Sequence, residues 1–201
     1  MTMLFGYDAW IALIGGYLIG SIPFGLLLVR AAGGGDIRKV GSGNIGTTNV
    51  LRAGGKKLAA ATLVLDAAKG LIPILLAQMY WPGGVAEQFA AAGAFLGHCF
   101  PVWLRFKGGK GVATLIGIGL GLHWTIGLSV VVVWLLAAKL SRISSVGGMS
   151  AAAAAPLAAL FFGHERFVLL LGLLLLIVLI RHRANIRRLV AGEEPRIGKK
   201  A

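Results

Sequence analysis

Long apolar runs separated by short polar connections dominate the sequence. A helix needs about 20 mostly apolar residues to cross the roughly 30 Å hydrocarbon core of a bilayer, at about 1.5 Å of rise per residue. Segments that meet or approach this length are Ala9–Val29, Leu58–Trp81, Val85–Leu104, Ser145–Phe162 and Phe167–Ile180. The pattern therefore predicts an all-α, polytopic membrane protein.

A sixth apolar stretch, Gly111–Leu140, is long for one crossing and short for two. Its connections on both sides are basic, and cations flanking membrane helices concentrate on the cytoplasmic side. An even number of crossings is therefore needed between them. We expect a helical hairpin of two short spans that bends near Leu122-His123-Trp124.

Composition and charge support the membrane assignment. The chain is 57% hydrophobic and 13% charged, whereas soluble domains contain about 45–50% apolar and about 25% charged residues. Of 20 Lys and Arg residues, 18 lie in the connections 30–57, 105–110 and 139–142 and in the tail from 181. The positive-inside rule assigns all four to the cytoplasm. Seven crossings follow, with the N-terminus outside, the C-terminus cytoplasmic, and one membrane domain over residues 1–201.

The net charge of +13 could also suit a nucleic-acid binder, but the chain has too little polar surface for that class, so no nucleic acid is expected. The single cysteine, Cys99, excludes an intrachain disulfide and a cysteine-based zinc site. His98, His123 and His164 show no metal-ligand spacing, and neither a metal nor a cofactor is expected. The tail from residue 189 is short and polar, and we expect it to be frayed.

The connection after the first apolar run is rich in glycine. Residues 41–46 read GSGNIG and match the dinucleotide-binding pattern, but the surrounding membrane helices exclude that fold. Glycines still allow successive N–H groups to converge on an anion, and Arg52 adds a planar fork suited to phosphate. A flexible basic loop is the alternative. The candidate phosphate-binding residues here are Gly41, Gly43, Asn44 and Thr48, with further donors on Ser42, Thr47 and Asn49.

A second glycine-rich connection reads FKGGKGVAT at 106–114. It is not a P-loop, because Gly111 stands where Ser or Thr would have to follow the lysine. Glycines and a lysine at the start of a helix nevertheless favour phosphate, since free N–H groups and the helix dipole attract an anion. The candidate residues are Lys107, Gly108, Gly109 and Lys110, and a positive-inside anchor with a tight turn is the alternative.

Polar residues also occur near the ends of the last two runs. Ser144 and Ser145 precede an alanine-rich run, where either could cap a helix. In RHRANIRR at 181–188, His182 and Asn185 share a face if the last helix continues. A basic collar at the membrane surface is the alternative for the arginines.

Asp66 and Lys69 lie three residues apart inside the second apolar run. An isolated charge near the middle of a membrane helix costs on the order of 2.5–3.5 kcal/mol on insertion scales. The two side chains must therefore pair with each other or face a polar cavity.

These segments resemble one family, the bacterial acyl-phosphate:glycerol-3-phosphate acyltransferases known as PlsY. The matching stretches are GSGNIGTTNVLRAGGKK at 41–57, LDAAKGLIP at 65–73, GHCFPVWLRFKGGKGVAT at 97–114 and RHRANIRRL at 181–189. The resemblance implies catalytic roles for Ser42, Arg52, Lys110, Ser145, His182 and Asn185. Relatives often carry an acidic residue where Ala184 stands, and Glu193 and Glu194 are the nearest acidic residues here.

The resemblance further implies transfer of a fatty acyl group from acyl phosphate to glycerol 3-phosphate, which yields lysophosphatidic acid and phosphate. No His-x4-Asp arrangement occurs, which disfavours acyl-CoA as the donor. We expect substrate-assisted catalysis, in which the protein orients the substrates and stabilises charge. The expected location is the bacterial inner membrane with a cytoplasmic active site. Expected partners are the two substrates, membrane lipid and, as a candidate, the enzyme that produces acyl phosphate.

Two other classes are compatible with basic loops on a membrane protein. An anion transporter often shows internal repeats and broken helices near the midplane. No repeat is visible here, and the donors gather at one face. A scaffold subunit could bind anionic lipid headgroups through the same loops.

Overall fold

The computed structural model describes residues 6–198. Its α-helices are α1 (Tyr7–Gly20), α2 (Phe24–Ala31), α3 (Thr47–Tyr80), α4 (Ala86–Cys99), α5 (Val112–Leu122), α6 (Trp124–Ser141), α7 (Ser144–Phe161), α8 (Val168–Arg181) and α9 (Arg183–Val190). Three short 3-10 helices are η1 (Ile37–Lys39), η2 (Val102–Leu104) and η3 (Glu165–Phe167). No β-strand occurs in residues 6–198, so the predicted all-α class is confirmed for this part of the chain.

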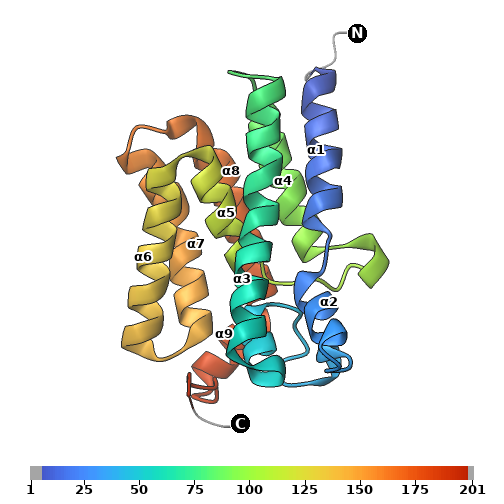
Figure 1. The fold of residues 1–201 in the computed structure, drawn as a ribbon. Helices are drawn as coiled ribbons and strands as arrows, with labels where there is room; N and C mark the ends of the chain where they lie inside the picture. Colours follow the sequence, from blue (N-terminus) through green and yellow to red (C-terminus); the bar gives the residue numbers. More distant parts are fainter. Residues whose placement is uncertain (1–5, 199–201) are drawn as a thin grey trace.

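The helices form one bundle in which α1 begins at one end and α9 lies at the other (Figure 1). Helices α3, α5 and α7 run in one direction, and α1, α4, α6 and α8 run in the other. The connections before α3 and before α7 therefore meet at the end that also holds α2 and α9. This topology brings polar segments far apart in sequence to one end of the bundle.

The helices differ in whether they are long and apolar enough to cross a membrane. Within residues 6–198, four helical segments are long and apolar enough to cross a bilayer: Tyr7–Ala31, Thr47–Tyr80, Trp124–Ser141 and Ser144–Phe161. A fifth is added if the segments on either side of a 60° bend, Glu165–Arg181 and Arg183–Val190, form one span. Helix α5 has only 11 residues. The seven crossings and the orientation of the termini therefore stay predictions.

The predicted hairpin within 111–140 is present. Helix α5 ends at Leu122 and α6 begins at Trp124. His123 between them has extended backbone and caps α6, because its ring nitrogen accepts from the Thr125 N–H at 3.4 Å. Gly119 and Gly127 bring the two helices close together, since a methyl group on Gly119 would lie 2.9 Å from the Cα of Gly127.

The first apolar run is not one continuous helix. Proline has no N–H to donate within a helix, and Pro23 separates α1 from α2. At the break the carbonyl of Ile22 accepts from the Lys69 ammonium at 2.8 Å and from the Phe24 N–H at 3.1 Å. Lys69 also pairs with Asp66 at 2.7 Å, and both side chains are buried. Pairing, one of the two predicted alternatives, is thus present, and Lys69 also binds a backbone carbonyl at the break.

Helix α3 begins 11 residues before the predicted span, at Thr47. Gly55 interrupts its helical geometry with a φ of 79°, a left-handed value that favours glycine. The turns before this kink carry Thr48 and Arg52. Part of the connection that the sequence predicts as a loop is therefore a helix, which fixes the direction of these side chains.

Within the described part of the tail, residues 191–198 contact the rest of the bundle, which the expectation of fraying did not include. The Ile197 N–H donates to the Arg142 carbonyl at 2.7 Å, which joins the tail to the α6–α7 connection. The Glu194 side chain is only 6% exposed. Buried polar contacts order this segment, and its own composition does not indicate them.

Candidate active site

A cavity of about 370 Å³ lies where the glycine-rich connections, the α6–α7 connection and the tail meet. Its wall includes all six residues to which the resemblance assigns catalytic roles: Ser42, Arg52, Lys110, Ser145, His182 and Asn185. The phosphate-binding candidates Gly41, Asn44 and Thr48 also line it, whereas Gly43, Lys107, Gly108 and Gly109 do not.

Three helices begin at this cavity. The first N–H groups of a helix have no partner within it, and they carry the positive end of the helix dipole. The cavity therefore combines three positive helix ends, and an anion is the ligand that such ends attract. The lining residues at these ends are Gly46, Thr47 and Thr48 at α3, Gly111, Val112 and Ala113 at α5, and Ser144 and Ser145 at α7.

The first glycine-rich connection is organised by Asn49. Its side-chain N–H groups donate to the carbonyls of Ile37, Val40 and Asn44 at 3.1, 3.0 and 2.8 Å. Its side-chain oxygen accepts from the Ser42 N–H at 3.1 Å. Asn49 is buried, and its amide holds the loop in shape. The sequence predicted that this amide would donate to a ligand, but the loop already uses it.

Several backbone N–H groups of this loop were expected to converge on an anion, but they donate hydrogen bonds within the loop instead. The Ser42 amide is held by Asn49, and the Gly43 amide donates to Val40 at 3.0 Å. The Gly46 amide donates to the Asn44 side chain at 2.8 Å. At these three positions the predicted anion-binding backbone is wrong, because the loop satisfies its own donors. What the loop presents to the cavity is side chains, above all Ser42 and Arg52.

The second connection is held from both sides. The amides of Gly108 and Gly109 donate to the carbonyls of Cys99 and His98 at 3.2 and 3.0 Å. Their own carbonyls accept from Arg181 at 2.6 and 3.0 Å. These backbone groups are thus occupied, and the turn serves to carry the next residue, Lys110, to the cavity.

Lys110 is part of a polar network that crosses the cavity. Its ammonium donates to the Asn185 side-chain oxygen at 2.6 Å. Burial lowers the pKa of Lys110 to about 8, and the Glu194 carboxylate acts in the opposite direction. A cationic donor with a pKa near neutrality is therefore held beside the start of α5.

Glu194 closes the network and was not predicted as a site residue. One carboxylate oxygen accepts from Ser145 and from Asn185, each at 2.6 Å. The other accepts from Arg188 at 2.7 Å. These bonds lower the pKa of Glu194 against the opposing effect of burial. The signal in the sequence was its position as one of two acidic residues near the last motif, but the partners lie up to 49 residues away.

His182 is buried at the junction of α8 and α9. Its Nδ1 lies 2.8 Å from the Val178 carbonyl, which can only accept, so Nδ1 carries the proton and Nε2 has a free lone pair. Burial and then the nearby Lys110 lower the pKa of His182 to about 4. The ring is therefore neutral at pH 7, and Nε2 is a hydrogen-bond acceptor with little tendency to take a proton.

The inner wall of the cavity contains Asp66 of α3 and His98 of α4. Both side chains are buried, and His98 Nδ1 lies 3.9 Å from the nearer oxygen of Asp66. The sequence assigned no role to His98, because a lone histidine at the end of an apolar run has no distinguishing pattern.

The cavity also has an apolar wall. Its side chains come from three helices: Leu63 of α3, Val112, Ala113 and Ile116 of α5, and Trp134 of α6. Polar donors and an apolar slot thus meet in one cavity, which suits an amphiphilic ligand.

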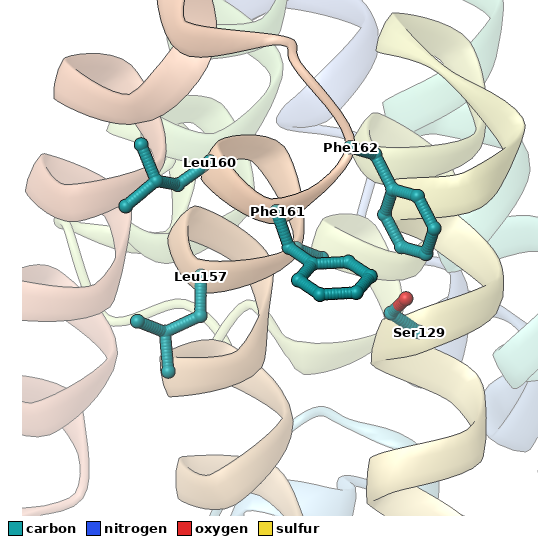
Figure 2. Close-up of a pocket in the computed structure, with 6 residues that line it drawn as sticks. Ser129, Leu157, Leu160, Phe161 and Phe162 are labelled. Carbon is teal, nitrogen blue, oxygen red and sulfur yellow. The ribbon is translucent and has the colours of Figure 1, made fainter.

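A second hollow lies between α6 and the C-terminal end of α7, where Phe161 and Phe162 approach Ser129 (Figure 2). Its lining is otherwise aliphatic, from Leu157 to Leu160. The Ser129 hydroxyl donates to the Thr125 carbonyl at 2.8 Å. This hollow offers no charged group, so the polar cavity is the candidate active site.

The sequence profile of the family described as glycerol-3-phosphate acyltransferase matches residues 10–192. The chain belongs to that family. A glycerol-3-phosphate acyltransferase of Erythrobacter litoralis (strain HTCC2594) is 56% identical over 98% of this chain and 100% of its own length. One of Mesorhizobium japonicum (strain LMG 29417 / CECT 9101 / MAFF 303099) is 55% identical over 96% of this chain and 98% of its own.

Two solved structures extend the similarity to three dimensions. A crystal structure of PlsY, described as an integral membrane glycerol 3-phosphate acyltransferase in its glycerol 3-phosphate form, superposes with a TM-score of 0.89 at 37% identity, covering 94% of this chain and 96% of that one. The lysophosphatidic acid form gives 0.88 at 35% identity, covering 94% and 95%. The resemblance to PlsY is thus confirmed. This chain is an integral membrane acyltransferase, which favours an enzyme over the transporter and scaffold alternatives.

Proposed function

We propose that this enzyme transfers a fatty acyl group from acyl phosphate to the hydroxyl of glycerol 3-phosphate, with lysophosphatidic acid and inorganic phosphate as products. One observation carries the proposal: the start of three helices, the cations Arg52, Lys110 and Arg188, and an apolar wall share one cavity. Both substrates are phosphates and one has a fatty chain, so the cavity matches the chemistry of the pair. The PlsY forms with glycerol 3-phosphate and lysophosphatidic acid support the acceptor and the product.

The two phosphates would share the donors of the cavity. Arg52 offers a bidentate fork, and within residues 6–198 its guanidinium forms no ion pair. Lys110, beside the start of α5, offers a point charge and adjacent helix amides. Ser42 and Ser145 add hydroxyls, and Gly41, Asn44 and Thr48 complete the polar wall.

The reaction forms a bond between the glycerol oxygen and the acyl carbon and breaks the bond between that carbon and the phosphate oxygen. Acyl phosphate is a mixed anhydride, so its phosphate is a good leaving group and can take the proton of the attacking hydroxyl. His182 Nε2 can accept a hydrogen bond from that hydroxyl and align it. A histidine with a pKa of about 4 is a weak base, which supports proton transfer to the departing phosphate.

Charge develops on the leaving phosphate as the acyl group departs. Lys110 and the helix N–H groups are already oriented toward the cavity, so little reorganisation is needed to stabilise that charge. Asn185 and Glu194 hold Lys110 and Ser145 in position through the network.

We further propose that the whole chain acts as one domain in the bacterial inner membrane with the cavity open to the cytoplasm. The cavity adjoins the basic connections 30–57, 105–110 and 139–142, which the positive-inside rule assigns to that side. A water-soluble enzyme that produces acyl phosphate could then deliver the donor from the same side.

The test is an assay of the purified protein with palmitoyl phosphate and radiolabelled glycerol 3-phosphate, with and without a chelator. We expect labelled lysophosphatidic acid and equimolar phosphate, unchanged by the chelator, and no product from palmitoyl-CoA. Robust turnover with palmitoyl-CoA, or loss of activity on chelation, would refute the proposed donor chemistry.

A further inference from the structure

The apolar wall of the cavity follows one face of α5. Along this helix the partly or fully exposed residues are Val112, Ala113, Ile116 and Leu120, and the rest are buried. The first three line the cavity, and Leu120 lies one turn beyond Ile116. The face therefore continues from the start of α5, where phosphate donors gather, toward the middle of the bundle.

Two other helices border this face at the cavity, α3 with Leu63 and α6 with Trp134. The border on the α6 side closes farther along, where α5 and α6 approach each other at Gly119 and Gly127. A methyl group on Gly127 would lie 2.5 Å from both the Cγ and the backbone nitrogen of Leu120 and 2.6 Å from its Cδ2, so Leu120 packs directly on the glycine. Leu120 therefore covers the contact between α5 and α6 at the far end of the exposed face.

We propose that Leu120, seated on Gly127, ends the acyl slot and sets how much of the fatty chain the enzyme holds. This inference rests on the proposed function, because it takes the fatty chain of the acyl donor as the occupant. From Val112 to Leu120 the helix rises about 12 Å, which matches an extended chain of roughly ten carbons. Longer chains turn outward at Leu120 into lipid.

Chain-length preference therefore depends on how far the Leu120 side chain blocks the slot. Lipid is as apolar as the slot, so a chain that turns outward loses close packing but no hydrophobic burial. The expected effects are accordingly modest. Removing the Leu120 side chain lengthens the slot.

The experiment compares kcat/KM for hexadecanoyl and decanoyl phosphate in Leu120→Ala and the wild-type enzyme. The ratio of the longer to the shorter donor should rise about three- to tenfold in Leu120→Ala. Leu173→Ala, a matched change on α8 where the side chain is 51% exposed, should leave the ratio unchanged.

Leu120 is 41% exposed, so Leu120→Ala should fold. Wild-type ratios in Leu120→Ala, with decanoyl transfer intact, would overturn the assignment of Leu120. A wild-type enzyme inactive with every acyl phosphate would instead refute the proposed donor. The two failures are therefore distinguishable.

Discussion

The Lys110 ammonium lies 2.6 Å from the side-chain oxygen of Asn185, 75 residues along the chain. This bond joins the start of α5 to α9 across the cavity. Glu194 extends it, since the Asn185 amide donates to that carboxylate at 2.6 Å. The Lys110 ammonium and the Glu194 carboxylate are thus connected through the Asn185 amide. Because the pKa of Lys110 is about 8, we expect the activity of the site to depend on pH.

The shape of the Arg52 charge should matter for catalysis. Lysine cannot reproduce two parallel hydrogen bonds to phosphate, and a lost charge-assisted bond costs roughly 1.5–3 kcal/mol. Arg52→Lys should therefore lower kcat/KM by about 10- to 100-fold. The measurement is steady-state kinetics for both substrates, with thermal stability checked in parallel.

The matched control is Arg187→Lys, an exposed arginine of α9 outside the cavity wall. Arg166 is unsuitable as a control, because it pairs with the buried Glu87 at 2.7 Å. If Arg52→Lys keeps wild-type kinetics, Arg52 serves only as a positive charge that helps to orient the chain in the membrane.

The pH dependence should report Lys110. Its pKa is about 8, so kcat/KM for glycerol 3-phosphate should fall as the pH rises through this value and the ammonium is lost. Glu194→Gln removes the negative charge that raises the pKa of Lys110, and the fall should move to lower pH. The glutamine keeps an oxygen acceptor for Ser145.

Glu193→Gln changes the same charge at an exposed neighbour and should leave the profile unmoved. Superimposable profiles for Glu194→Gln and the wild-type enzyme would show that another group controls the alkaline side. His182, with a pKa of about 4, should contribute no change between pH 6 and 8.

Lys69 should be important for stability. Lys69→Met leaves Asp66 buried without its partner and removes one of the two donors to the Ile22 carbonyl, the other being the Phe24 N–H. Breaking one side of a buried ion pair costs about 3–5 kcal/mol. Thermal unfolding in detergent should therefore show a clear loss for Lys69→Met and a smaller one for the Asp66→Asn/Lys69→Met pair. Equal losses in both would argue against an uncompensated charge as the cause.

Asn49 should control the order of the first connection. Asn49→Asp replaces the donors to three carbonyls with an oxygen that repels them. Amide hydrogen exchange in residues 36–46 should accelerate strongly, and kcat should fall at least about tenfold, since the positions of Ser42 and Arg52 depend on this loop.

Asn44→Asp is the control for the exchange measurement, because it keeps the oxygen that accepts from the Gly46 amide. Unchanged protection in Asn49→Asp would mean that the loop is ordered by other contacts.

Local pattern in the sequence was sufficient for several features of this protein. Hydrophobic length and charge predicted a helical membrane protein, and the two basic flanks of 111–140 predicted the hairpin that bends at His123. The cost of an isolated charge predicted that Asp66 and Lys69 either pair or face a polar cavity, and the pairing is present. These features depend on neighbours within one or two turns, which a sequence displays directly.

Only the tertiary structure decided which polar groups are free to meet a ligand. The amides of Gly108 and Gly109 were expected to bind phosphate, yet the end of α4 and Arg181 occupy their backbone groups. Glu194, in a tail expected to fray, became part of the site through Ser145 and Asn185. The physical reason is that each buried donor or acceptor takes a partner wherever the fold supplies one, and such partners lie on helices whose proximity no local pattern records.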